Sequence, residues 1–234
     1  MTQDTPSQAP RPARFRRMAG LAATAIAAAL LAGCARQPPV PDWRLNAHDA
    51  ATRATEAYLS GADRVAAQEW SRARAEVART ARPDLLARTV LLECAARVAS
   101  LDATGCPAFE PLRADAADAE RAYADYLEGR AGPAAAQQLP PAQRAVLAGG
   151  APALAGVEDP LARLVAAGAL VRRGGGTAEV ARVAIDTASA QGWRRPLMAW
   201  LLHASALAAG RGDTVEAEAL RRRLAVLERG GEPR

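Results

Sequence analysis

The sequence predicts an all-α body built from antiparallel helical hairpins. Half of the residues are hydrophobic but only 4% are aromatic, and the apolar content is rich in Ala and Leu, which favour helices. Runs of β-branched residues, which would favour strands, are almost absent. Glycine and proline recur between the apolar segments, at the spacing where helices end and the next ones begin.

A first helical lobe is predicted over residues 46–128. Asn46 followed by Asp49 is a typical helix start, and Pro83 is a favourable first residue for a later helix. The helix that begins at Pro83 is apolar on most faces, so we expect it at the centre of the lobe. The four helices expected here cover residues 46–59, 62–80, 83–101 and 113–128.

Residues 129–157 are predicted to be a linker with one short helix that ends near Ala148, because Gly, Pro and Ala dominate the segment. A second helical lobe follows over residues 158–229, and residues 230–234 are expected to be a disordered tail. Asp213 and Glu216 have the spacing of a capping box. The helices expected in the second lobe cover residues 160–173, 177–191, 196–209 and 214–229.

The first 34 residues have the layout of an export signal. Four arginines precede an apolar stretch, Ala19 to Leu31, which is shorter than the ~20 residues that a membrane-spanning helix needs. The stretch ends in Leu31-Ala32-Gly33-Cys34, which resembles the lipobox of bacterial lipoproteins. An ordinary secretory leader, a single membrane helix, or a twin-arginine signal at Arg16-Arg17 are the alternatives.

The lipoprotein resemblance implies that residues 1–33 are a cleaved signal peptide and that Cys34 carries the acyl chains. Several acyl chains on one residue give stable anchoring in a lipid bilayer. Residues 34–45 would form a Pro-rich tether that keeps the body near the membrane. Ala35 stands where lipoproteins retained at the inner membrane usually carry Asp. We therefore expect an outer-membrane anchor with the body facing the periplasm, ahead of the inner membrane or the cell surface.

Cys94 and Cys106 are predicted to form a disulfide. Export would place them in an oxidising compartment, and the loop 102–105 is long enough to fold back along the helix that carries Cys94. A loop of this size is worth roughly 3 kcal/mol in the chain-entropy model. The spacing differs from C-x-x-C, so the bond is expected to be structural and not redox-active.

Two stretches resemble the helical hairpins of tetratricopeptide repeats, and the resemblance covers about half of the exported chain. In the first, small residues lead into Gly61-Ala62-Asp63; in the second, Trp200, Ala204 and Leu207 lead into Gly210-Arg211-Gly212-Asp213. Small residues allow paired helices to approach closely. The spacing departs from the repeat period, which leaves an irregular α-solenoid or a bundle of generic hairpins open.

No catalytic, metal or cofactor motif stands out. The two histidines, His48 and His203, have no second ligand at metal-binding spacing, and the sequence contains no G-x-S-x-G, H-E-x-x-H or P-loop pattern. We therefore expect no enzyme, no metal, no cofactor and no small-molecule substrate. The basic charge of the whole chain lies partly in the leader, so nucleic-acid binding is not expected either.

These observations predict a membrane-anchored, non-enzymatic scaffold or assembly factor that binds a protein or peptide partner in the envelope. Trp193, beside Arg194 and Arg195, is the best candidate for a partner contact. One alternative is a cell-wall-active enzyme that uses a carboxylate pair. Another is a body that occupies the membrane surface through its basic second half, residues 129–234.

Overall fold

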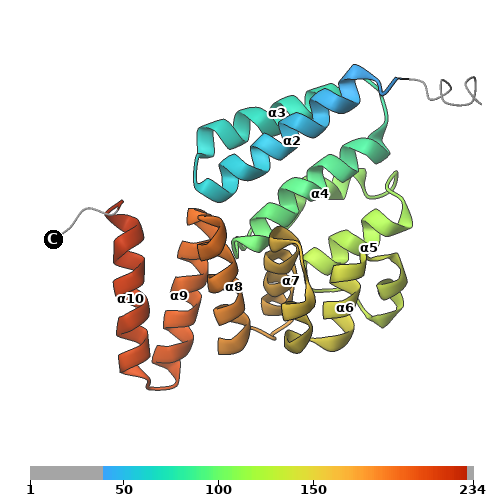
Figure 1. The fold of residues 1–234 in the computed structure, drawn as a ribbon. Helices are drawn as coiled ribbons and strands as arrows, with labels where there is room; N and C mark the ends of the chain where they lie inside the picture. The colour runs from blue at the N-terminus through green and yellow to red at the C-terminus, as the bar shows by residue number, and fades with distance from the viewer. Residues whose placement is uncertain (1–38, 231–234) are drawn as a thin grey trace, which may run out of the picture. The chain divides into compact units, whose positions relative to one another are not determined.

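The computed structural model describes residues 39–230, and every regular element in that range is a helix. The all-α prediction is therefore confirmed. Figure 1 shows the helices in chain order. The α-helices are α2 (Asp42–Ser60), α3 (Asp63–Ala78), α4 (Pro83–Ala99), α5 (Asp118–Leu127), α6 (Pro141–Gly149), α7 (Pro160–Arg172), α8 (Ala178–Gln191), α9 (Arg194–Gly210) and α10 (Thr214–Glu228). The 3-10 helices are η2 (Pro107–Leu112), η3 (Pro133–Gln138) and η4 (Ala151–Gly156).

Helices α2 and α3 form an antiparallel hairpin with a small core of its own. Trp70 is buried there among alanines of both helices, including Ala54 and Ala73. The alanines allow the two helices to approach closely, which is why the core needs only one large side chain. Arg53 and Glu69 form an ion pair across the hairpin, with 3.1 Å between the charged atoms.

The helix predicted to be central, α4, has that position. It contacts α2, α3, α5 and α7, and Figure 1 shows it beneath the α2–α3 hairpin. Residues on nearly all its faces are buried, Leu91, Cys94 and Val98 among them. The Nε1 of Trp200 in α9 donates to the carbonyl of Ala99, 3.0 Å away, so α9 is tied to the end of α4.

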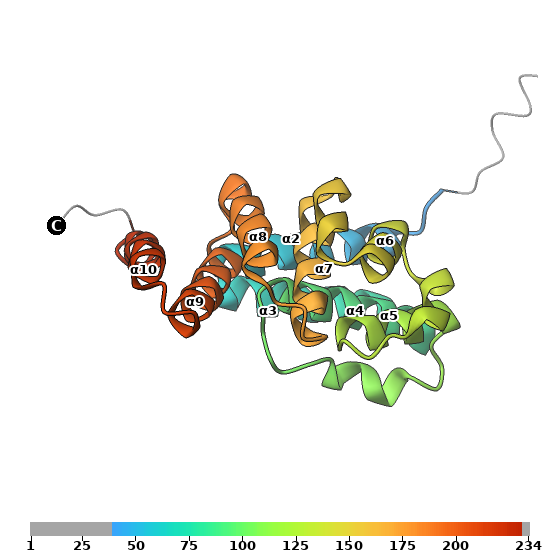
Figure 2. The ribbon, with the colours of Figure 1, turned by 90° about the horizontal axis from the view of Figure 1, so that it is seen from below.

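The short helix predicted to end near Ala148 is present as α6, but the rest of residues 129–157 is not a linker between two lobes. The segment folds into η3, α6 and η4, and Leu139, Val146 and Leu154 are buried in the same apolar core as α4 and α7. Figure 2 shows α6 beside α7. Contacts between α4 and α7 and between α2 and α9 join the two predicted lobes. From Asp42 onward the chain forms one compact unit.

Two helix boundaries also differ from the predictions. The first helix begins at Asp42 instead of Asn46, directly after Pro41, so residues 42–45 are helical and do not belong to a tether. The helix expected over 113–128 is shorter, because residues 113–117 are not helical and α5 begins only at Asp118. The predicted tail lies outside the described residues except for Gly230.

The Asp213 cap is confirmed in part. Its Oδ1 accepts from the amide of Glu216 at 2.9 Å, as an N-cap requires. The Glu216 carboxylate pairs with Arg211 and does not complete the capping box. No helix within residues 39–230 is both long enough and apolar enough to cross a bilayer.

Candidate functional site

Two predictions concern cysteines: a disulfide between Cys94 and Cys106, and lipidation of Cys34. Cys94 in α4 and Cys106 before η2 form a disulfide, with their Cα atoms 5.5 Å apart; that prediction is confirmed. Both residues are almost fully buried. Cys34 lies outside the described residues, so its lipidation remains a proposal.

Trp193 and Arg195, predicted to contact a partner, also contact the α2–α3 hairpin of the same chain. Trp193 Nε1 donates to Glu56 Oε2 at 3.1 Å. Arg195 Nε donates to the Tyr58 carbonyl at 2.7 Å, and its guanidinium lies 4.3 Å from the centre of the Tyr58 ring. Arg195 also pairs with Asp63. We call these five residues the α2–α9 clasp; a partner contact of Trp193 and Arg195 remains a prediction.

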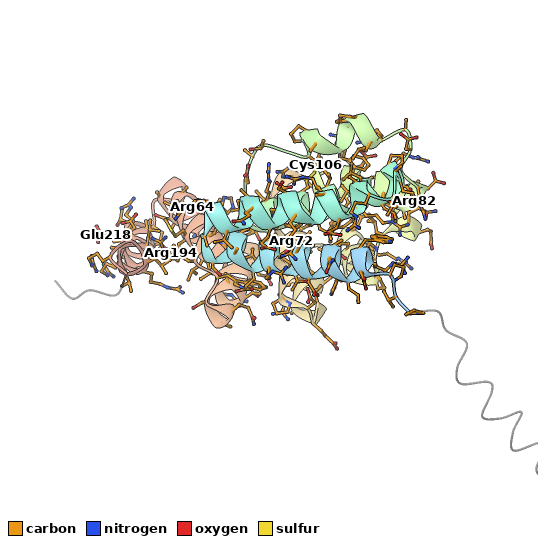
Figure 3. All side chains as sticks on the ribbon, turned by 90° about the horizontal axis from the view of Figure 1, so that it is seen from above. Arg64, Arg72, Arg82, Cys106, Arg194 and Glu218 are labelled. Carbon is orange, nitrogen blue, oxygen red and sulfur yellow. A yellow bond between two sulfur atoms is a disulfide. The ribbon has the colours of Figure 1, made fainter. Side chains whose placement is uncertain are left out.

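Arg194 lies beside the clasp and is exposed. Its Nη2 donates to the carbonyl of Leu227 in α10 over a long 3.4 Å. Figure 3 shows Arg194 at the same end of the α2–α3 hairpin as Arg64. Of the three predicted contact residues, Arg194 is the one whose side chain is held least by the rest of the chain.

His48 and His203 do not belong to any cluster of metal-ligating side chains within residues 39–230. No group of three metal-ligating side chains occurs among the residues that the structure describes. His48 is exposed on α2. His203 is half-buried, and its ring meets that of Trp200 edge-on, with 5.8 Å between the centres. Desolvation lowers the pKa of His203, which favours the neutral ring expected of a structural histidine.

A groove of about 490 Å³ lies between α4, α5 and the segment that joins η3 to α6. We call it the α4–α6 groove. Leu91 and Leu92 of α4, Tyr123 of α5 and Leu139 after η3 supply its apolar surface, and Leu92 is 52% exposed. A concave, mostly apolar surface of this size with a few polar groups is typical of a binding site.

The charged side chains of the groove are arranged unevenly. Arg88 Nε lies 2.6 Å from Glu120 Oε1, so these two charges compensate one another. The other oxygen of Glu120 is buried and accepts no hydrogen bond from the described residues. Arg144 donates through Nη2 to the carbonyl of Leu139 at 3.1 Å, and within the described part of the chain it meets no carboxylate. The groove therefore has an uncompensated positive charge beside its apolar surface.

Local sequence positions explain how the groove is built. Arg88, Leu91 and Leu92 are three and four residues apart, so they share one face of α4. Glu120 and Tyr123 do the same on α5. Desolvation on burial raises the pKa of Tyr123 above the ordinary value of a phenol. The groove was not predicted, because its residues come from segments between 88 and 144 and no short motif joins them.

Comparison with known proteins leaves the family open: no family model, no curated protein and no solved structure matches the chain.

Proposed function

We propose that the chain is a lipid-anchored, non-enzymatic protein of the bacterial envelope, and that it binds a protein or peptide partner in the α4–α6 groove. The single observation that supports binding is the groove itself, where exposed Leu92 and half-buried Tyr123 lie next to the charge of Arg144. Apolar surface ringed by polar groups is what a binding site for a partner segment requires.

The proposed anchor rests on the sequence Leu31-Ala32-Gly33-Cys34. Acylation of Cys34 would hold the body at a membrane, and Ala35 favours the outer one, with the groove presented to the periplasm. The disulfide between Cys94 and Cys106 supports an oxidising compartment.

Cleavage of cell-wall glycans by a carboxylate pair receives no support from the groove. Glycoside cleavage uses two carboxylates in separate roles. Glu120 is the one carboxylate that lines the groove, and Arg88 already neutralises it.

The test is photo-crosslinking in living cells. A photoreactive amino acid replaces Leu92 in the groove or Val215 on α10, which is the matched control because it is also apolar and is 76% exposed. We expect a discrete crosslinked product from position 92 and none of that mass from position 215. The same products from both positions, or none from position 92, would contradict binding in the groove.

The anchor needs a separate measurement. The mass of the processed protein should correspond to residues 34–234 plus acyl chains, and Cys34→Ala should abolish both acylation and membrane retention. An N-terminus that begins elsewhere, or a processed chain without added acyl mass, would contradict the lipoprotein assignment.

A further inference from the structure

We propose that the occupant of the α4–α6 groove is the C-terminal end of an extended peptide, bound through its last apolar side chain and its terminal carboxylate. This inference rests on the proposed function and names the chemistry of the partner. Three features of the groove lead to it: the apolar surface, the charge of Arg144, and the amide side chains of Gln137 and Gln138.

The apolar surface provides a place for one large side chain. Leu91 and Leu139 are buried beneath it, and Leu92 and Tyr123 are partly exposed beside it. An aliphatic or aromatic side chain that settles here removes exposed carbon from water, and that is the usual source of binding free energy for such a contact.

The positive charge of Arg144 favours an occupant that carries a negative charge. The Arg88 charge is compensated by Glu120, so the charge that remains at the rim is positive. A guanidinium presents two parallel N–H groups to a carboxylate, which makes Arg a strong and directional partner for that anion. Charge complementarity therefore favours an anionic occupant over a neutral or cationic one.

The short distance between charge and apolar surface favours a C-terminal residue. Arg144 donates to the backbone carbonyl of Leu139, and both residues line the groove with the Leu139 side chain buried beneath it. The charge and the apolar contact are thus neighbours. A C-terminal residue carries both its side chain and its carboxylate on one Cα, whereas an internal acidic side chain would have to come from a different residue than the apolar one.

The two glutamine side chains favour the binding of a peptide over the binding of a fatty acid. Gln137 and Gln138 are exposed residues that line the groove, and each amide can donate to a carbonyl and accept from an N–H. A peptide backbone offers both groups. An acyl chain offers neither and would leave these amides facing hydrocarbon, which is unfavourable.

The test measures the binding of fluorescein-labelled tripeptides to the full chain in lipid-bilayer discs, by fluorescence anisotropy. The probes are Ala-Ala-Phe with a free carboxylate, the same peptide as a C-terminal amide, Ala-Phe-Glu amide, and Ala-Ala-Ala with a free carboxylate. Unlabelled laurate serves as a competitor. We expect the free-acid Phe peptide to bind at least tenfold more tightly than each of the other three peptides, and laurate to compete poorly.

Variants assign the preference to the groove. Arg144→Gln should make the acid and the amide of Ala-Ala-Phe bind equally, while Arg144→Lys keeps the charge and should retain part of the preference. Arg182→Gln is the control, because Arg182 is an exposed arginine on α8 outside the groove, and it should change nothing. Circular dichroism of each variant checks that the helices are intact.

Several results would overturn the inference: no binding of the free acid, equal binding of acid and amide, binding of Ala-Phe-Glu amide as tight as that of the free acid, or stronger competition by laurate. If one of these occurs while position 92 still gives its crosslinked product, the groove binds a partner of other chemistry and the proposed function stands. If the crosslink is absent as well, the proposed function fails too.

Discussion

Gly168 in α7 lies directly against the carbonyl oxygen of Val98 in α4. A Cβ atom on Gly168 would be 2.2 Å from that oxygen and 2.9 Å from the Val98 carbonyl carbon. These are backbone atoms of a buried helix, so they cannot move aside as the end of a flexible side chain can. The absence of a side chain at residue 168 is therefore what allows α7 to pack on the central helix.

We expect Gly168→Ala to lower the free energy of unfolding by about 3 kcal/mol or more, at the upper end of the cost of overpacking. Gly210→Ala is the matched control, because Gly210 is also in a helix and nothing lies within 4 Å of the position its Cβ would take. That change should be neutral or slightly stabilising. Urea unfolding followed by circular dichroism measures both, and equal effects would show that the close approach does not matter.

Arg195→Ala should loosen the α2–α3 hairpin. The change removes the hydrogen bond to the Tyr58 carbonyl, the contact with the Tyr58 ring and the ion pair with Asp63. We expect a loss of about 1–2 kcal/mol, with faster hydrogen exchange in α2 and α3 than in α7.

The control for this change is Arg182→Ala, which breaks an exposed pair with Asp186 on the surface of α8. Its effect should stay within about 0.5 kcal/mol. Faster exchange spread evenly over all helices in Arg195→Ala would argue against a specific role of the clasp.

Replacing both Cys94 and Cys106 by Ala should cost roughly 2–4 kcal/mol, because the disulfide closes a loop between residues 12 apart in the sequence. The same loss should follow reduction of the unaltered protein, and the variant should no longer respond to a reductant. A variant as stable as the oxidised parent would show that packing alone holds this loop.

At alkaline pH, ionisation of the Tyr58 phenol should lower the free energy of unfolding. Burial, followed by the nearby charge of Asp102, raises the pKa of Tyr58 from 10.0 to about 12. Because the folded state favours the protonated phenol, the stabilisation is complete below pH 10 and is lost as the pH rises from 10 to 12. Since Tyr58 is partly exposed, we expect a loss of about 1–2 kcal/mol.

The measurement is urea unfolding at a series of pH values above 9, combined with tyrosinate absorbance. Tyr58→Phe should flatten part of this pH dependence. Tyr123 and Tyr126 also have raised pKa values because of burial, so they will supply the remainder. A pH profile unchanged in Tyr58→Phe would mean that Tyr58 ionises freely in the folded chain.

Helix ends could be predicted wherever the signal is local. Pro83, Pro160 and Asp213 lie at or beside observed helix starts, and Gly192 ends α8 with a left-handed backbone at φ 68°. Proline and glycine act through their own backbone geometry, so no knowledge of the tertiary structure is needed. α2 begins at Asp42, directly after Pro41, four residues before the start that the Asn46 cap signal predicts.

Burial in residues 129–157 could not be predicted from local pattern. Leu139, Val146 and Leu154 are spaced by seven and eight residues, but Pro140, Pro141, Gly149 and Gly150 interrupt the segment, so the spacing does not indicate one continuous helix. Their burial depends on α7 and α8, which come later in the chain. The same limit applies to the groove, and to the clasp, whose Trp193–Glu56 contact joins residues 137 apart.

The disulfide has a consequence for how the protein matures. Cys94 belongs to the helix on which α2, α3, α5 and α7 all pack, so the oxidation of one pair of thiols acts on the helix at the centre of the body. A chain kept in a reducing space would be easier to unfold, and one that reaches an oxidising space would gain the stability that the disulfide contributes.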